Sequence, residues 1–159
     1  MRTVLTDKVA SGRKELVAIV VPEKARVTLP ENAPAANTWK GDFGDKSGDS
    51  IILRSAQGHR WMLIRSSKKS SMSNEDVRVA SAMARNQAET MERTGVTIDL
   101  SMTKQTSAMV HAAAEGAGMA SYDHGICKAD RKKPHARKIS ISVSQVTTEL
   151  KKAVRQGSI

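Results

Sequence analysis

Apolar residues gather in short runs in the first part of the chain, which favours strands over helices. Residues 15–21 (ELVAIVV) form a continuous, mostly β-branched run that ends at Pro22. Such a run is typical of a strand buried on both faces, as in a sheet covered by helices. Two further strands are expected at residues 49–55 and 59–65, joined by a short glycine-containing turn at residues 56–58.

The segment 73–95 has the clearest helical pattern. Its apolar side chains recur three or four positions apart: Val77, Ala80, Ala84, Ala88 and Met91. This spacing places them on one face of a helix, which we expect to pack on the sheet. Ser73 suits the N-cap position, and Gly95 suits the C-terminal end of the helix.

A short strand and a second helix are expected next. Residues 96–100 (VTIDL) alternate as a strand does, and residues 104–122 have helical spacing. Small residues recur on the inner face of this predicted helix: Ala108, Ala112, Ala113, Gly116 and Ala120. An inner face this small allows a close approach to neighbouring elements.

The remaining segments complete an alternation of strands and helices. Residues 26–49 are interrupted by Pro30, Pro34 and several glycines, so we expect a loop with at most a short helical turn. A last strand is expected at residues 138–143, and a last helix begins at Thr148. This order predicts an α/β fold with a mixed, mostly parallel sheet.

The length and composition fit one domain, because the chain has 159 residues of which 39% are hydrophobic. We expect an N-terminal extension at residues 1–14, an α/β domain at residues 15–147 and a C-terminal helix at residues 148–159. Aromatic residues are only 3% of the chain, so the core must consist of aliphatic side chains and Met. Reading of single-stranded bases by aromatic stacking is therefore not expected.

Cysteine usage and hydropathy bear on the compartment. The single Cys cannot form an internal disulfide, which fits a reducing intracellular setting such as the mitochondrial matrix or the cytoplasm. Residues 1–14 are basic, faintly like an organelle presequence, and lack the apolar core of a secretion signal. No apolar run approaches the roughly 18 residues that span a bilayer, so no membrane partner is expected.

Positive charge is concentrated near the C-terminus. The net charge is +10, and residues 124–159, with nine basic and two acidic side chains, carry +7 of it. Such an excess favours contact with a polyanion such as RNA, because neutralised phosphates release their counterions. The alternative is an ordinary solvated basic face.

The densest basic cluster is the segment 128–138, which Pro134 prevents from forming a continuous helix. We expect its cations to contact phosphates: Lys128, Arg131, Lys132, Lys133, Arg137 and Lys138.

Other motifs in this region have structural alternatives that we favour. The G-x-G at residues 116–118 lies late in a helical pattern, away from the positive helix end, so it fits close packing better than phosphate binding. His124, Cys127 and His135, with Asp123 or Asp130, lack the spacing of a zinc site. Cys127 near His124 lacks an acyl-transfer motif and fits an ordinary thiol.

Two more groups of candidate ligands also have ordinary interpretations. Asp42, Asp45 and Asp49 resemble a calcium loop without its terminal bidentate Glu, so a polar turn is favoured. His59 and His111 fit packed or surface residues better than metal ligands. We therefore expect no catalytic residue, no metal and no cofactor.

Several motifs, in order, resemble the N-terminal domain of the two-metal leucyl aminopeptidases. The family's G-x-F-x-G-K-x-G turn is similar to residues 41–48, with Asp45 in place of a glycine. The family's E-G-x-x-L-x-S-Y helix end is similar to residues 115–122, and Lys128 also matches, whereas His124 and Cys127 replace aromatic residues. The resemblance extends from about residue 15 to residue 159.

The resemblance implies a macro-domain-like, three-layer α/β/α fold, with residues 148–159 as the exit toward a catalytic domain. The family's metal ligands and catalytic arginine lie in that other domain, so no aminopeptidase activity is expected from this chain. In the family this domain helps to assemble a hexamer, and in some bacterial members it takes part in DNA binding. The Pro-interrupted segment at residues 26–49 replaces a long family helix. Oligomer contacts like those of the family are therefore not expected, and a homo-oligomer stays an alternative.

These observations lead to three hypotheses. The first is a non-catalytic binding or structural subunit that docks through its basic surface onto RNA or an RNA–protein assembly, such as a mitochondrial ribosome, beside other protein subunits. The alternative is the N-terminal regulatory or assembly domain of a leucyl aminopeptidase. A third, resting on fold analogy alone, is binding of an ADP-ribose-like ligand.

Overall fold

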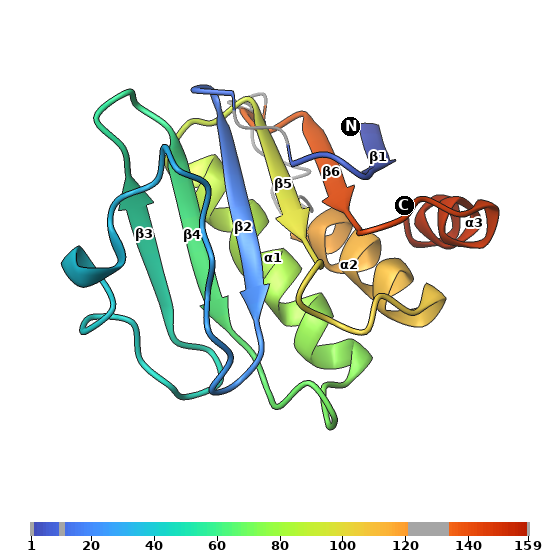
Figure 1. The fold of residues 1–159 in the computed structure, drawn as a ribbon. Coiled ribbons are helices and arrows are strands. Elements are labelled where there is room, and N and C mark those ends of the chain that lie inside the picture. Colours follow the sequence, from blue (N-terminus) through green and yellow to red (C-terminus); the bar gives the residue numbers. More distant parts are fainter. Residues whose placement is uncertain (1, 10–11, 121–133, 159) are drawn as a thin grey trace, which may run out of the picture.

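A six-stranded, mostly parallel sheet forms the centre of the computed structural model, which describes residues 2–9, 12–120 and 134–158. The strands lie in the order β1-β6-β5-β2-β4-β3, and only the β3–β4 pair is antiparallel (Figure 1). Their bounds are Arg2–Thr6 (β1), Glu15–Val21 (β2), Ser50–Arg54 (β3), Arg60–Arg65 (β4), Gly95–Asp99 (β5) and Lys138–Ser142 (β6). The predicted mixed, mostly parallel α/β fold of macro-domain type is confirmed.

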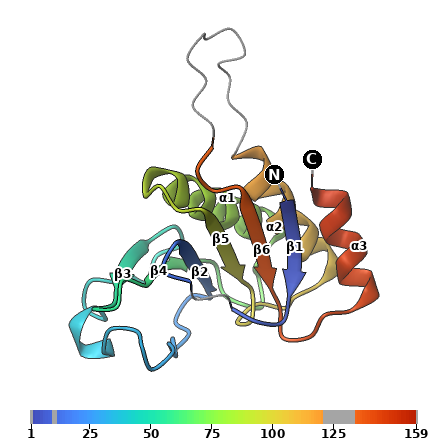
Figure 2. The same cartoon turned by 90° about the horizontal axis from the view of Figure 1, so that it is seen from above.

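The two faces of the sheet have different covers (Figure 2). Helices α1 (Asn74–Thr90) and α2 (Ser107–Met119) lie on one face, and α3 (Thr148–Gly157) packs beside α2 near the β1 edge. On the other face, the loop after β2 crosses β2, β4 and β3 and contains only a short 3-10 helix, Ala36–Thr38. The predicted loop with at most one helical turn is therefore confirmed for this segment.

Helix α1 begins where its sequence predicts and ends earlier. Ser73 Oγ accepts the backbone N–H of Asp76 at 3.1 Å, and the Asp76 carboxylate accepts the N–H of Ser73 at 2.7 Å, which together form a capping box. The helix ends at Thr90 rather than at Gly95. Gly95 is instead the first residue of β5, so its expected role as a helix terminator is wrong.

Helix α2 is more completely buried than a single inner face predicts. It lies between α1 and α3 as well as on the sheet, so Met109, Val110 and Ala114 are buried too, whereas Ala108 is exposed. A Cβ at Gly116 would come within 2.2 Å of the carbonyl oxygen of Arg78 on α1. The glycine thus has a packing role, as expected, although its neighbour is a helix and not the sheet.

Both ends of the chain belong to the domain. Residues 2–6, inside the expected N-terminal extension, form the edge strand β1 parallel to β6, so the boundary at residue 15 is wrong. Helix α3 buries Leu150, Ala153 and Val154, and a Cβ at Gly157 would come within 2.4 Å of the carbonyl oxygen of His111. Among the described residues, no helix is long and apolar enough to cross a membrane.

Candidate polyanion interface

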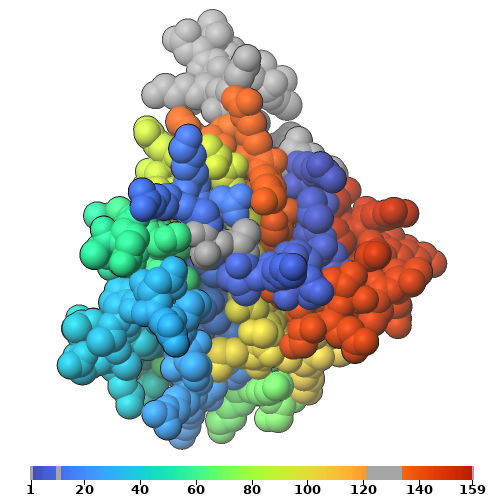
Figure 3. Space-filling view, turned by 45° about the horizontal axis from the view of Figure 1, so that its top comes forward, coloured from blue at the N-terminus to red at the C-terminus, as the bar shows by residue number. Residues whose placement is uncertain are grey.

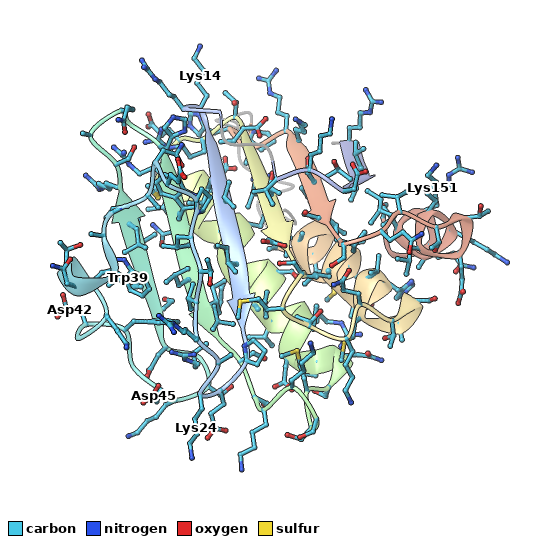
Figure 4. The ribbon with its side chains drawn as sticks, viewed as in Figure 1. Lys14, Lys24, Trp39, Asp42, Asp45 and Lys151 are labelled. Atoms are coloured by element: carbon cyan, nitrogen blue, oxygen red, sulfur yellow. The ribbon has the colours of Figure 1, made fainter. Side chains whose placement is uncertain are left out.

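Segments far apart in the sequence meet at the edge of the sheet where the parallel strands begin, here called the amino edge (Figure 3). The strand register aligns these beginnings: Arg2 lies beside Lys138, Lys138 beside Gly95, and Leu16 beside Arg60. The basic residues described there are Arg2, Arg13, Lys14, Arg54, Arg60, Arg93, Arg137 and Lys138. Lys14 points away from the sheet into solvent (Figure 4).

The structure brings two of the six predicted contact residues to this edge. Arg137 and Lys138 are exposed at the start of β6. Lys128, Arg131, Lys132 and Lys133 lie outside the described residues, as do Asp123, His124, Cys127 and Asp130. The described chain resumes at Pro134, four residues before β6 begins at the amino edge.

Lys138 is partly committed to an ion pair. Its Nζ lies 3.0 Å from Glu15 Oε1, and the pair spans β5, because Glu15 and Lys138 both align with Gly95. A Cβ at Gly95 would lie 3.4 Å from Glu15 Cγ and 3.2 Å from the carbonyl oxygen of Lys138. The glycine therefore leaves room for the bridge, and Lys138 keeps about half of its side chain exposed.

Glu89 on α1 fixes the chain where it returns to the amino edge. Its two carboxylate oxygens accept the backbone N–H groups of His135 at 2.6 Å and of Ala136 at 3.1 Å. Burial alone would raise the pKa of Glu89, but these two hydrogen bonds and the one from Arg85 lower it below the ordinary value of 4.5. The ionised carboxylate is thus the form that holds residues 135 and 136.

Six of the eight basic residues at this edge are absent from the predicted contact set. Three of them, Arg54, Arg60 and Arg93, are hereafter called the amino-edge arginines. Arg54 and Arg60 are the last facing pair of the β3–β4 ladder, and Arg93 lies just before β5. Arg54 and Arg60 flank a predicted hairpin turn, so their pairing could have been inferred from the sequence. Arg93 has no such signal, because only the tertiary fold brings it near them.

At the opposite edge of the sheet, one buried arginine is enclosed by partners from the fold. The Arg65 guanidinium donates to the carbonyl oxygens of Gly44 and Pro22, both at 3.1 Å, and of Ala25 at 3.3 Å. It also lies 4.2 Å from the centre of the Phe43 ring and 3.5 Å from Asp45. This side chain, only 6% exposed, thus fixes the loop that covers the second face.

The loop held by Arg65 also borders a cavity of about 930 Å³, whose wall includes Trp39 and Phe43. Lys24, Arg26 and Lys40 line this cavity together with Glu31 and Asp45, so its wall carries charge of both signs. Lys24 and Asp45 lie far from Lys14 at the amino edge (Figure 4). This mixed lining fits a polyanion less well than the amino edge does.

The other candidate ligands take part in local structure. Asp45 pairs with Arg65, and Asp49 accepts the backbone N–H of Lys46, as expected of a polar turn. The His59 ring packs at a centroid distance of 5.8 Å from Trp61. Within residues 2–9, 12–120 and 134–158, no three His, Cys, Asp or Glu side chains gather as a metal site would require.

No protein-family model and no curated protein matches the chain. Solved structures do match its fold. The bottromycin maturation enzyme BotP in complex with Mn has a TM-score of 0.66 and 19% identity, over 89% of this chain and 28% of its own. A second structure of the bottromycin maturation enzyme BotP has a TM-score of 0.67 and 18% identity, over 89% of this chain and 29% of its own.

A mutant of tomato leucine aminopeptidase gives a TM-score of 0.75 and 17% identity, over 98% of this chain and 35% of its own. At these identities the likeness concerns the fold. The chain therefore spans about a third of the length of the leucine aminopeptidase whose fold it shares.

Proposed function

We propose that this chain is a non-catalytic binding or structural subunit, related to the N-terminal domain of leucyl aminopeptidases, that docks onto RNA or an RNA–protein assembly such as a mitochondrial ribosome. Its contact surface is the amino edge together with the basic segment 128–138. The proposed subunit has no catalytic role. The family's metal ligands and catalytic arginine belong to the other domain, so none is assigned to a residue of this chain.

The observation that supports the proposal most is the concentration of cations at the amino edge. Eight basic residues gather there from six segments of the chain. Of the acidic residues beside them, Glu15 is paired with Lys138 and Glu89 holds two backbone N–H groups and Arg85. A surface with this excess of unpaired positive charge attracts phosphates and releases their counterions.

The basic segment is tested by replacing Arg131, Lys132 and Lys133 together with Ala. Binding to single-stranded RNA should weaken, and its dependence on salt should flatten by about two units of slope, since about 0.7 unit accompanies each phosphate contact. Thermal stability should stay nearly unchanged. Fluorescence anisotropy at several salt concentrations and a thermal melt provide the two readouts.

A matched control removes the same charge from a different surface. Lys151, Lys152 and Arg155 are exposed on α3, and their joint replacement with Ala also removes three positive charges. This variant should bind RNA nearly as the unchanged protein does. Equal weakening in both variants would reject a specific surface, and unfolding of the first variant would assign its residues a structural role.

The second candidate is the N-terminal regulatory or assembly domain of a leucyl aminopeptidase. It is favoured by the match to 98% of this chain but only 35% of tomato leucine aminopeptidase. Mass spectrometry of the native protein separates the candidates. Peptides beyond Ile159 that contain the family's metal-binding residues would establish the second one.

A further inference from the structure

Among the amino-edge arginines, Arg60 lies near enough to Arg54 and Arg93 to interact with both charges. Arg54 and Arg60 align directly across the antiparallel ladder, so their side chains share a face. That face is opposite to the one occupied by Trp61 and Leu53, the preceding pair of the ladder. Like charges directly opposite each other in a sheet are destabilising.

Arg60 and Arg93 are half-buried, and each donates a hydrogen bond to one backbone carbonyl group. Arg60 Nη1 donates to the carbonyl oxygen of His59 at 3.1 Å, and Arg93 Nη1 donates to that of Arg13 at 2.9 Å. The Nε atoms of both side chains are shielded from solvent and have no hydrogen-bond partner among the described residues. Each guanidinium group therefore keeps donors that the described part of the fold does not use.

No carboxylate of the described residues lies within 4.0 Å of these three guanidinium groups. Burial, followed by the charges of Arg54 and Arg93, lowers the pKa of Arg60. By contrast, Arg65, Arg78 and Arg85 each have a carboxylate partner. Like charges held near one another repel, and a bound anion would offset that repulsion.

We propose that Arg54, Arg60 and Arg93 bind one phosphoryl group, either as inorganic phosphate or within a nucleic-acid backbone. A phosphoryl group offers several oxygens around one centre, and planar guanidinium groups bind such oxygens in pairs. Three arginines match a phosphate dianion better than a single carboxylate, which one guanidinium can satisfy. In an RNA complex the site fixes one backbone phosphate at the amino edge, but its existence does not depend on the proposed function.

The experiment is a ¹H–¹⁵N NMR titration of the full chain with inorganic phosphate at constant ionic strength, balanced with chloride. Saturable shifts are expected at the amides of residues 54, 60 and 93. Arg54→Gln removes an exposed side chain with no contact to lose in the fold, and it should weaken phosphate binding about tenfold. Arg155→Gln, on α3, makes the same change of charge and should leave the affinity unchanged.

A second variant tests the site at Arg93, one of its two half-buried arginines. Arg93→Lys retains the positive charge and loses the planar pair of donors, so phosphate binding should weaken while the folded spectrum is retained. The absence of saturable shifts, or equal weakening in the Arg54→Gln and Arg155→Gln variants, would overturn the site.

A parallel titration with a short single-stranded RNA separates this proposal from RNA docking. If the RNA shifts the same three amides and Arg54→Gln weakens both ligands, the bound group is a backbone phosphate. If phosphate binds and RNA does not, the site holds free phosphate and the docking proposal fails. If RNA binds and Arg54→Gln affects neither ligand, the site is wrong while docking stands.

Discussion

The arginines of the helix layer and of the edge opposite the amino edge differ from the amino-edge arginines in what surrounds their charge. Arg78 contacts Glu75 and Glu115, which joins α1 to α2, and Arg85, only 2% exposed, contacts Glu89. Arg65 is enclosed by carbonyl oxygens, Asp45 and Phe43. Each of these side chains has a carboxylate partner within the fold.

At the amino edge the fold leaves positive charge without a counter-charge. Arg54, Arg60 and Arg93 have no carboxylate partner in the part of the chain that the structure describes. A protein gains no stability from like charges held together, since they repel each other. The contrast teaches that partner and burial, rather than residue type, separate arginines that stabilise this fold from arginines available to a ligand.

The distinction between paired and unpaired arginines fails if replacing a paired arginine does not lower the stability of the protein. Arg65→Met should destabilise the protein by about 3 kcal/mol, because the carbonyl groups of Gly44, Pro22 and Ala25 lose a charged donor. Arg54→Met makes the same substitution at an exposed, unpaired site and should stay within about 0.5 kcal/mol. Urea denaturation measures both free energies of unfolding, and similar values would refute the distinction.

The pairing within the helix layer depends on a close approach of α1 and α2. Gly116→Ala should destabilise the protein by about 2 kcal/mol, because the new methyl group meets the Arg78 backbone. The higher helix propensity of Ala offsets part of the cost. Gly41→Ala is the control, since a Cβ there has open space around it. Thermal melts that shift equally for the two variants would count against this packing.

The smallest effect concerns the attachment of residues 135 and 136 to Glu89. Because the folded-state pKa of Glu89 is lowered, its contribution is complete above the ordinary pKa of 4.5 and is lost as pH falls through the lowered value. Since the carboxylate is partly exposed, the contribution is about 1 kcal/mol or less. Glu89→Gln should therefore flatten the loss of stability between pH 5 and pH 3, about the range in which paired carboxylates protonate.

NMR supplies the local readout for the same pair of proteins. The amide shifts of His135 and Ala136 should follow the titration of Glu89 in the unchanged protein and stay constant in Glu89→Gln. Shifts that move identically in both would show that another group titrates there.

The sequence predicts helices and strands well where the pattern of apolar residues matches the burial of one strand or one helix face. The run at residues 15–21 becomes β2, buried on both faces, and Ser73 caps α1 as expected. Strand β1 escapes prediction because it has five residues and half-buried side chains at a sheet edge. For α2, the flanking helices bury positions that a one-face pattern leaves outside.

The candidate site was predictable where basic residues are contiguous in the sequence or flank a predicted hairpin turn. Arg137 and Lys138 belong to a basic run in the sequence and lie at the amino edge, although Lys138 forms an ion pair with Glu15. Arg93 joins Arg54 and Arg60 only because three parallel strands begin side by side. Counting charge along the chain cannot reveal a cluster that strand order creates.

The salt dependence of RNA binding tests the central claim most directly. The full chain is titrated with a single-stranded RNA at salt concentrations from low to physiological. If the amino edge and the basic segment bind phosphates, the logarithm of the affinity should fall linearly with the logarithm of salt concentration, by roughly 0.7 for each phosphate contacted. Absence of binding at low salt, or an affinity that salt does not change, would contradict the account.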